Sequence, residues 1–552
     1  MRDTRTFMRL GTLHLLIAIG FLSSQCQLLQ AQKQGLASIR EGDLRPHMEF
    51  LASGEVEGRA TGETGGSAAA RYLEVQARSL GLREAVAGQG LFQEYALASR
   101  SYDMKKSRIR IETTTGEETD LQLPFYSLTG LGRDSVHVEG DFVFAGYGIH
   151  DEANGYLDLA GVDVKDKIVL IMDGGPTSED GTSGLLPGRE WGNLQVSLQT
   201  KLPGLMQLGP KAVLLVPGPK SGAQDLDDLV PGMADAMSHS YSFPDRTPMG
   251  LPIPPVLFVH RKVADAILAT AGKDLAELQQ AIDRDLTPRS FVLEGKRGSV
   301  DLIVKQEALE TANVFGILPG SDPEWSQEII LYVAHYDHLG TNASGEVFFG
   351  ADDNASGSVA LLEVAGAFLA EKRAPARSVG FLWVSGEEIG LFGSRYFADH
   401  PLVPLERIAA VINLDMVGRS KTPEDEQSDR DELTISGKDT VKVLGGLQSE
   451  ILMEINREAL KELGLVGNYT YNDLSLPGQF FYRSDHINFA RKDIPVLFYS
   501  TGTHADYHRV TDRPDRIDYD VFVRMCKLAY LSGYKATGFA GEIIVDNPMS
   551  GW

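Results

Sequence analysis

The stretch IILYVAHYD, residues 329–337, is the most informative part of the chain, because an apolar run ends there in a histidine and an aspartate. A second apolar run, VGFLWV at 379–384, follows a segment with helical spacing at 358–372. Strands that are apolar throughout are typical of parallel sheets covered on both faces. From residue 301 onward the sequence therefore predicts an α/β fold, in which a mixed, mostly parallel central sheet has helices on both faces.

Side chains that commonly bind metals follow the ends of such apolar runs. The five candidates, in chain order, are His335, Asp352, Glu388, Asp415 and His508. In α/β sheets, ligands bind where the strands end at their carboxyl edge. Two imidazoles and three carboxylates, with no thiolate, suit Zn²⁺, and one bridging carboxylate would let five ligands hold two ions. We therefore expect a site for two zinc ions.

Each candidate has a simpler explanation when it is taken alone. A histidine at a strand end is often structural, and the acidic pair Asp352 and Asp353 could cap a helix. Adjacent Glu387 and Glu388 could form a solvated acidic turn. Their combination favours a metal site, since a metal at Glu388 would relieve the repulsion and leave Glu387 free as a general base.

The surrounding motifs resemble those of the M28 family of zinc peptidases. They are HYD at 335–337, DDNASG at 352–357, GEE at 386–388, NLDM at 413–416 and THADYHRVTD at 503–512. The resemblance implies the zinc exopeptidase fold and a water activated between two zinc ions by the general base. Arg509-Val510 departs from the Thr-Pro pair that is common in this family, which affects the expected shape of the pocket rather than the ligand.

The same resemblance implies individual roles. Asp352 would bridge the two metals, and Asp337 would orient the imidazole of His335. Tyr507 and Tyr482 are both candidates to donate a hydrogen bond to the tetrahedral oxyanion, and Tyr507 is preferred because it adjoins a ligand. The SDH motif at 484–486 matches a family motif near the substrate pocket, whereas His338, His486 and His504 are not expected to bind metal.

The predicted function is an exported di-zinc metallopeptidase with peptide substrates, most simply an aminopeptidase. A glutaminyl-cyclase-like aminoacyltransferase with one zinc is one alternative, and a carboxypeptidase or dipeptidase of the same fold is another. A binding protein with an inactive site of this fold would be expected to lack ligands or the base. The number of metals per chain, two, one or none, separates these classes.

The middle of the chain has a different pattern. Residues 126–300 resemble a protease-associated (PA) domain, through GYG at 146–148 and VDVKDKIV at 162–169. We therefore expect a β-rich domain inserted between two parts of the peptidase domain, residues 32–125 and 301–552. This inserted domain is not expected to supply a metal ligand.

The N-terminus predicts export. Three arginines precede the apolar run at 13–22, which is too short to span a bilayer and has the charge order of a secretory signal covering residues 1–31. Lipidation at Cys26 is the alternative. Cleavage would leave Cys526 as the only cysteine, so no internal disulfide is expected. The formal charge of −24 makes nucleic acid a poor partner, and the sequence does not predict an oligomeric state.

Overall fold

The computed structural model describes residues 34–549, apart from 114–117, 122–124, 128–132, 153–154, 178–193, 221–238, 246–253, 343, 429–433 and 477. The chain divides into two compact units, of which the first comprises Met1–Tyr95 with Glu310–Trp552 and the second Ala96–Leu309. The predicted signal at 1–31, with Cys26, lies outside the described residues. Among those described, no helix is long and apolar enough to span a membrane.

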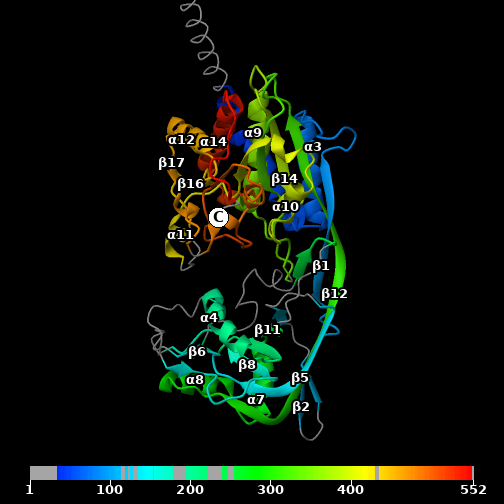
Figure 1. The fold of residues 1–552 in the computed structure, drawn as a ribbon, viewed down its shortest axis with the longest axis vertical. Helices are drawn as coiled ribbons and strands as arrows, with labels where there is room; N and C mark the ends of the chain where they lie inside the picture. The colour runs from blue at the N-terminus through cyan, green and yellow to red at the C-terminus, as the bar shows by residue number, and fades with distance from the viewer. Residues whose placement is uncertain are drawn as a thin grey trace, which may run out of the picture. The chain divides into compact units, whose positions relative to one another are not determined.

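The first unit is built on a mixed, mainly parallel sheet, as predicted (Figure 1). Its strands follow the order β17 (Val466–Asn468), β16 (Thr440–Gly445), β18 (Val496–Ser500), β15 (Ile408–Leu414), β13 (Ile329–His335), β14 (Ser378–Val384) and β12 (Phe291–Leu318). The central strand β13 pairs in parallel with β14 and β15, and β15 pairs in parallel with β18. Strand β16 is antiparallel to β18, and β12 is antiparallel to β14.

Helices cover both faces of this sheet, which explains why β13 and β14 are buried along their whole length. One apolar core packs the sheet against α2 (Glu41–Leu51), α3 (Thr64–Ser79), α9 (Gly357–Leu369), α12 (Glu450–Leu463) and α14 (Tyr519–Gly538). The other core involves α10 (Phe392–Asp399) and α13 (His486–Ala490). Helix α9 is apolar on nearly every side because it is almost wholly buried.

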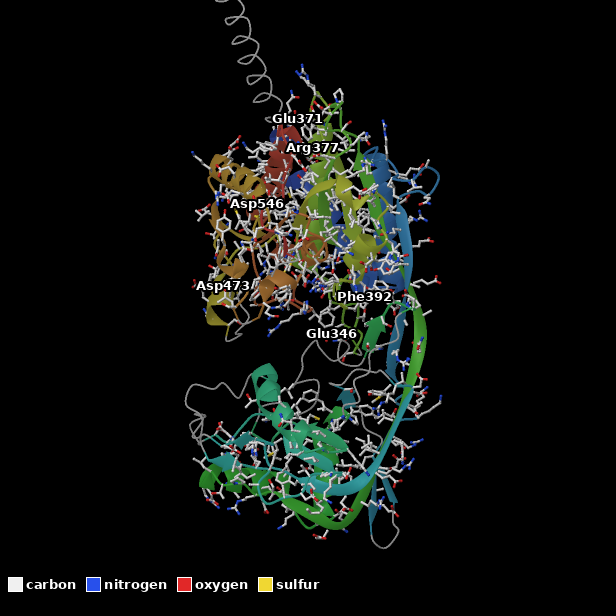
Figure 2. The ribbon with its side chains drawn as sticks, in the orientation of Figure 1. Glu346, Glu371, Arg377, Phe392, Asp473 and Asp546 are labelled. Carbon is white, nitrogen blue, oxygen red and sulfur yellow. The ribbon has the colours of Figure 1, made fainter. Side chains whose placement is uncertain are left out.

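A buried arginine fixes the end of the C-terminal helix. Arg377, labelled in Figure 2, directly precedes β14 and donates to the carbonyl oxygens of Ala536 and Phe539 at the end of α14. Its Nε also donates to a carboxylate oxygen of Glu328 at 2.7 Å. The last carbonyls of a helix lack partners within the helix and carry partial negative charge, so a guanidinium at this point stabilises the helix end.

The second unit has its own sheet and its own core. Its strands follow the order β12, β5 (Ser135–Phe144), β8 (Ile168–Met172), β9 (Ala212–Val216), β11 (Val256–Val259) and β4 (Phe125–Ser127). Helices α4 (Leu194–Gln207), α7 (Arg261–Ala269) and α8 (Leu275–Asp285) belong to this unit. Its apolar residues form two clusters, on β5, β8, β9 and β11.

The second unit is longer than the predicted insertion of residues 126–300. Strand β2 (Arg108–Thr113) pairs with β12 from Lys296 to Asp301, and β4 pairs with β11. These pairings extend the unit on both sides, because they bind residues before 126 and after 300 to its sheet. Its resemblance to a protease-associated domain stays a prediction.

Candidate metal centre

Four of the five predicted ligands lie together where the strands of the first unit end. His335 closes β13, Glu388 follows β14, and Asp415 directly follows β15. His508 lies in the loop after β18. Strands β14, β13 and β15 are adjacent and parallel, so their carboxyl ends meet at one edge of the sheet. The prediction that these residues meet there agrees with the structure.

The centre of the cluster is Asp353, in the irregular turn Ala351–Ser356 that precedes α9. Its Oδ1 lies 3.5 Å from His335 Nε2, and that nitrogen lies 3.4 Å from Asp415 Oδ1. Its Oδ2 lies 3.1 Å from His508 Nε2, which is also 3.1 Å from Glu388 Oε2. The two oxygens of one carboxylate therefore face two separate pairs, each made of an imidazole and a carboxylate.

This geometry corrects the choice of Asp352 as the bridging residue. The carboxylate of Asp352 accepts a hydrogen bond from the main-chain N–H of Gly418 at 2.6 Å and lies 3.3 Å from His504 Nε2. It therefore binds a neighbouring loop, and the position between the two imidazole–carboxylate pairs is taken by Asp353. The two residues are adjacent and both buried, so the sequence pattern alone did not separate them.

The turn that holds Asp353 is fixed by side chains from distant parts of the chain. Both carboxylate oxygens of Asp512 accept from the main-chain N–H of Asp352, and one also accepts from that of Asp353. The buried guanidinium of Arg59 donates to the carbonyls of Tyr336 and Gly350. Arg59 thus ties together the segments that carry His335 and Asp353, and no motif in the sequence indicated this role.

Asp337 is buried beside the cluster, but its contacts differ from those predicted. His335 Nδ1 lies 3.1 Å from the main-chain oxygen of Asp337 and 3.8 Å from its carboxylate. The carboxylate instead accepts from the main-chain N–H groups of Glu387 and Glu388, at 3.2 and 3.3 Å, and from the hydroxyl of Thr61 at 2.8 Å. Asp337 therefore orients His335 chiefly through its carbonyl, and its carboxylate positions the Glu387-Glu388 turn.

The two adjacent glutamates have different electrostatic surroundings. Burial, together with the charge of Glu388, raises the pKa of Glu387 well above its ordinary value. Burial also acts to raise the pKa of Glu388, but the neighbouring imidazoles of His508 and His338 outweigh it and lower that pKa. Glu387 lies 3.9 Å from His335 Nε2, at the margin of the cluster. Glu388 is therefore a carboxylate that imidazoles keep ionised, whereas Glu387 binds a proton more readily than an ordinary glutamate.

The remaining histidines lie outside the two imidazole–carboxylate pairs. His338 is buried, and its Nδ1 lies 2.6 Å from Glu388 Oε1 and 3.8 Å from Asp353 Oδ2, so it adjoins the cluster at these two carboxylates. His504 lies beside Asp352. His486 is buried between Phe481 and Phe498, and burial lowers its pKa to about 3. Neither His504 nor His486 approaches the cluster as a ligand.

A pocket opens beside the cluster. It is lined by four of the carboxylates, those of Asp353, Glu387, Glu388 and Asp415, and by Tyr507. The ring of Tyr507 stacks on that of His508, with centroids 3.9 Å apart. Of the two tyrosines predicted as oxyanion donors, Tyr507 lines this pocket and Tyr482 does not.

The cluster has the chemistry of a cation site. The buried Asp353 Oδ2 has the imidazole of His508 beside it, at 3.1 Å, and no described Lys or Arg forms an ion pair with Asp353, Glu387, Glu388 or Asp415. Ligand atoms of His335, Asp353 and Asp415 lie within 4.8 Å of one another. Buried carboxylates that only imidazoles neutralise are costly unless a cation completes the set. The nitrogen and oxygen donors fit zinc.

Part of the chain is similar to a known peptidase family. Residues 313–531 match the sequence profile of peptidase family M28. A probable leucine aminopeptidase of Arthroderma otae is 27% identical over 195 residues, which cover 33% of this chain and 53% of that protein. The chain spans about half the length of such curated relatives, or less.

Two solved structures share the fold along most of the chain. An aminopeptidase from Aneurinibacillus sp. strain AM-1 has a TM-score of 0.52 at 18% identity, covering 94% of this chain and 98% of that one. BSAP, a zinc aminopeptidase from Bacillus subtilis, has a TM-score of 0.51 at 18% identity, covering 92% and 99%. The two structures show the fold that this chain shares, and the profile match makes residues 313–531 similar to peptidase family M28.

Proposed function

We propose that the chain is an exported zinc-dependent aminopeptidase that holds two metal ions. The observation that carries the proposal is the placement of Asp353, whose two carboxylate oxygens face two imidazole–carboxylate pairs. His335 and Asp415 would hold one ion, His508 and Glu388 the other, and Asp353 would bridge them. Zinc bound there would act as a Lewis acid on the scissile carbonyl and lower the pKa of a water towards about 7.

The protein's own residues supply the proton transfers. The carboxylate of Glu387 would accept a proton from the attacking water and deliver it to the nitrogen of the leaving amine. Asp337 holds the main chain of Glu387 in place, and Ser484 donates to Asp415 Oδ2 at 2.7 Å, which fixes that carboxylate. The hydroxyl of Tyr507 would donate to the oxyanion, since burial raises the pKa of Tyr507 and keeps it protonated.

Removal of N-terminal residues is the preferred peptidase activity. The carboxylates that line the pocket would attract the free α-amine of a peptide. All three similar proteins described above are named as aminopeptidases, one of them as a probable leucine aminopeptidase and another as a zinc aminopeptidase. Export stays part of the proposal, because it depends on the sequence pattern of residues 1–31.

Two measurements on the purified full-length chain test this function. Metal analysis after dialysis should give about two zinc ions per chain, whereas one ion would favour the cyclase-like alternative. Aminoacyl p-nitroanilides with a free amine should be hydrolysed and their N-acetylated forms should not. If the protein instead removed residues from the carboxyl end of N-blocked peptides, its activity would be that of a carboxypeptidase and not of an aminopeptidase.

A further inference from the structure

The pocket beside the metal centre contains a buried lysine. Lys442 lies on β16, and its strand neighbour Leu444 lines the same pocket, since residues two apart share one face of a strand. The rings of Tyr471, Phe480 and Phe498 supply much of the remaining lining. An apolar pocket wall with one charged group is typical of a site that selects a side chain by its tip.

The charge of Lys442 has little compensation within the protein. The residue is only 4% exposed, and its Nζ donates one hydrogen bond, to Ser436 Oγ at 2.7 Å. The Nζ also lies 5.6 Å from the centroid of the Tyr471 ring. No carboxylate among the described residues forms an ion pair with it. An ammonium group has three donors, so two remain for a ligand.

The fold makes room for this lysine at Gly502. A Cβ at residue 502 would come within 2.7 Å of Lys442 Cε and 2.9 Å of its Nζ, and the backbone there has φ +105. Any other residue would therefore displace the lysine tip and strain the backbone. Burial lowers the pKa of Lys442 to about 8, so the group is mostly charged at neutral pH.

Arg483 also lines the pocket, but unlike Lys442 it does not need an anionic ligand to balance its charge. Arg483 is exposed, and its guanidinium lies 5.0 Å from the centroid of the Phe480 ring. Water satisfies an exposed guanidinium, whereas an ammonium buried without a counter-ion is costly. The need for an anionic partner therefore lies at Lys442.

We propose that Lys442 is a specificity-determining residue, which binds the carboxylate of an acidic side chain, preferentially glutamyl, at the N-terminus of the substrate. The aromatic and aliphatic walls would pack the methylene groups of that side chain, and Lys442 would bind its tip. This inference rests on the proposed aminopeptidase function and names its substrate class. A leucyl side chain in the pocket would leave the ammonium group of Lys442 buried without a counter-ion, which is costly.

The test compares full-length, zinc-loaded protein on glutamyl, glutaminyl and leucyl p-nitroanilides. The kcat/KM for the glutamyl substrate should exceed that for the glutaminyl and leucyl substrates roughly tenfold to hundredfold, as expected for a hydrogen-bonded charge. Lys442→Met should lower the glutamyl-to-leucyl ratio by a similar factor, mainly through KM. Lys442→Arg should keep part of the preference, and Lys442→Glu should shift it towards lysyl and arginyl substrates.

Controls separate specificity from folding and from the proposed function. Lys461→Met, at an exposed position of α12, should leave all ratios unchanged. Zinc content and melting temperature of Lys442→Met should match or exceed those of the wild type, because the substitution removes a buried charge. An active wild type whose glutamyl-to-leucyl ratio is unaffected by Lys442→Met would overturn this inference alone. Absence of hydrolysis of every free-amine substrate by zinc-loaded protein would overturn the proposed function and this inference together.

Discussion

Both units of the chain bury charged side chains, but they neutralise them differently. In the second unit, Asp158 accepts from the main-chain N–H groups of Tyr147 and Ile149, and Asp283 pairs with Lys220 at 2.9 Å. Lys201 donates to the carbonyl of Met172 at 3.1 Å, and the charges of Asp173 and Asp158 partly offset the effect of burial, which lowers its pKa to about 7. These charges find hydrogen-bond or ion-pair partners within the protein, so they read as structural.

The cluster of the first unit is left incomplete by the protein. The carboxylates of Asp353, Glu387, Glu388 and Asp415 have imidazoles beside them and no Lys or Arg ion pair among the described residues. Burial alone therefore does not identify a functional site. An uncompensated set of donors does, because it requires an external cation to be stable.

The largest effect that would test this contrast is expected at the general base. Glu387→Gln should keep both zinc ions and lower kcat/KM about 10³-fold or more, since general base catalysis contributes roughly 10²–10⁴ and water activation is coupled to it. Steady-state kinetics on a leucyl or glutamyl substrate, with zinc analysis of the same sample, measures both. Turnover near the wild-type rate in the zinc-loaded variant would exclude Glu387 as the base.

The next effect concerns the two neighbouring aspartates. Asp353→Asn should lose zinc from both positions, because it removes the carboxylate that faces both pairs. Asp352→Asn should keep two zinc ions, because the amide oxygen can still accept from Gly418. Metal analysis after dialysis decides between them. Equal zinc loss from the two variants would contradict the proposal that Asp353, and not Asp352, binds both ions.

A smaller difference is expected between two histidines that both approach Glu388. His508→Ala should lose about one zinc per chain, since His508 Nε2 is equidistant from Asp353 and Glu388. His338→Ala should retain both ions with affinity weakened about 10–100-fold, as for residues that orient a metal ligand. Zinc titration against a competing chelator measures this. If His338→Ala lost the ion and His508→Ala kept it, the ligand role would pass to His338.

The smallest effect on catalysis is expected in the second unit. Asp158→Ala should lower the free energy of unfolding by about 2–6 kcal/mol, because it leaves two buried N–H groups unpaired. Asp158→Asn keeps an acceptor oxygen and should cost much less. Denaturant unfolding of this unit measures the change, and kcat/KM on a short substrate should stay that of the wild type. A loss of zinc or turnover in a folded variant would contradict a purely structural role.

The same position gives a prediction of pH dependence. Burial raises the pKa of Asp158 from about 3.8 to about 7. A raised pKa in the folded state means that folding takes up a proton, so this stabilisation is complete below pH 3.8 and is lost as the pH rises through about 7. An asparagine at residue 158 does not titrate, so Asp158→Asn should not lose stability in this way as the pH rises. The free energy of unfolding of Asp158→Asn relative to the wild type should therefore be higher at pH 8 than at pH 5. A difference that is independent of pH would show that Asp158 does not titrate in this range.

Much of the fold and of the site could be predicted from local sequence. The apolar strands around 329–335 and 378–384 follow from composition, and they place His335 and the turn at Glu388 at one sheet edge because parallel strands end together. The boundaries of the second unit could not be predicted from local sequence. They depend on the pairing of β2 and β4 with distant strands, which no local pattern records.

The sequence by itself determined the chemical types in the centre and their order, since each follows a strand end that hydrophobicity reveals. The tertiary structure decided which of two adjacent aspartates faces the ligands, because Asp512 and Arg59, remote in sequence, fix the backbone of that turn. It also decided the burial of Lys442, whose alternation with Val441 and Val443 on β16 would suit a solvent-exposed face. Direction and burial of a side chain depend on which distant segments pack against it, and the local sequence does not contain that information.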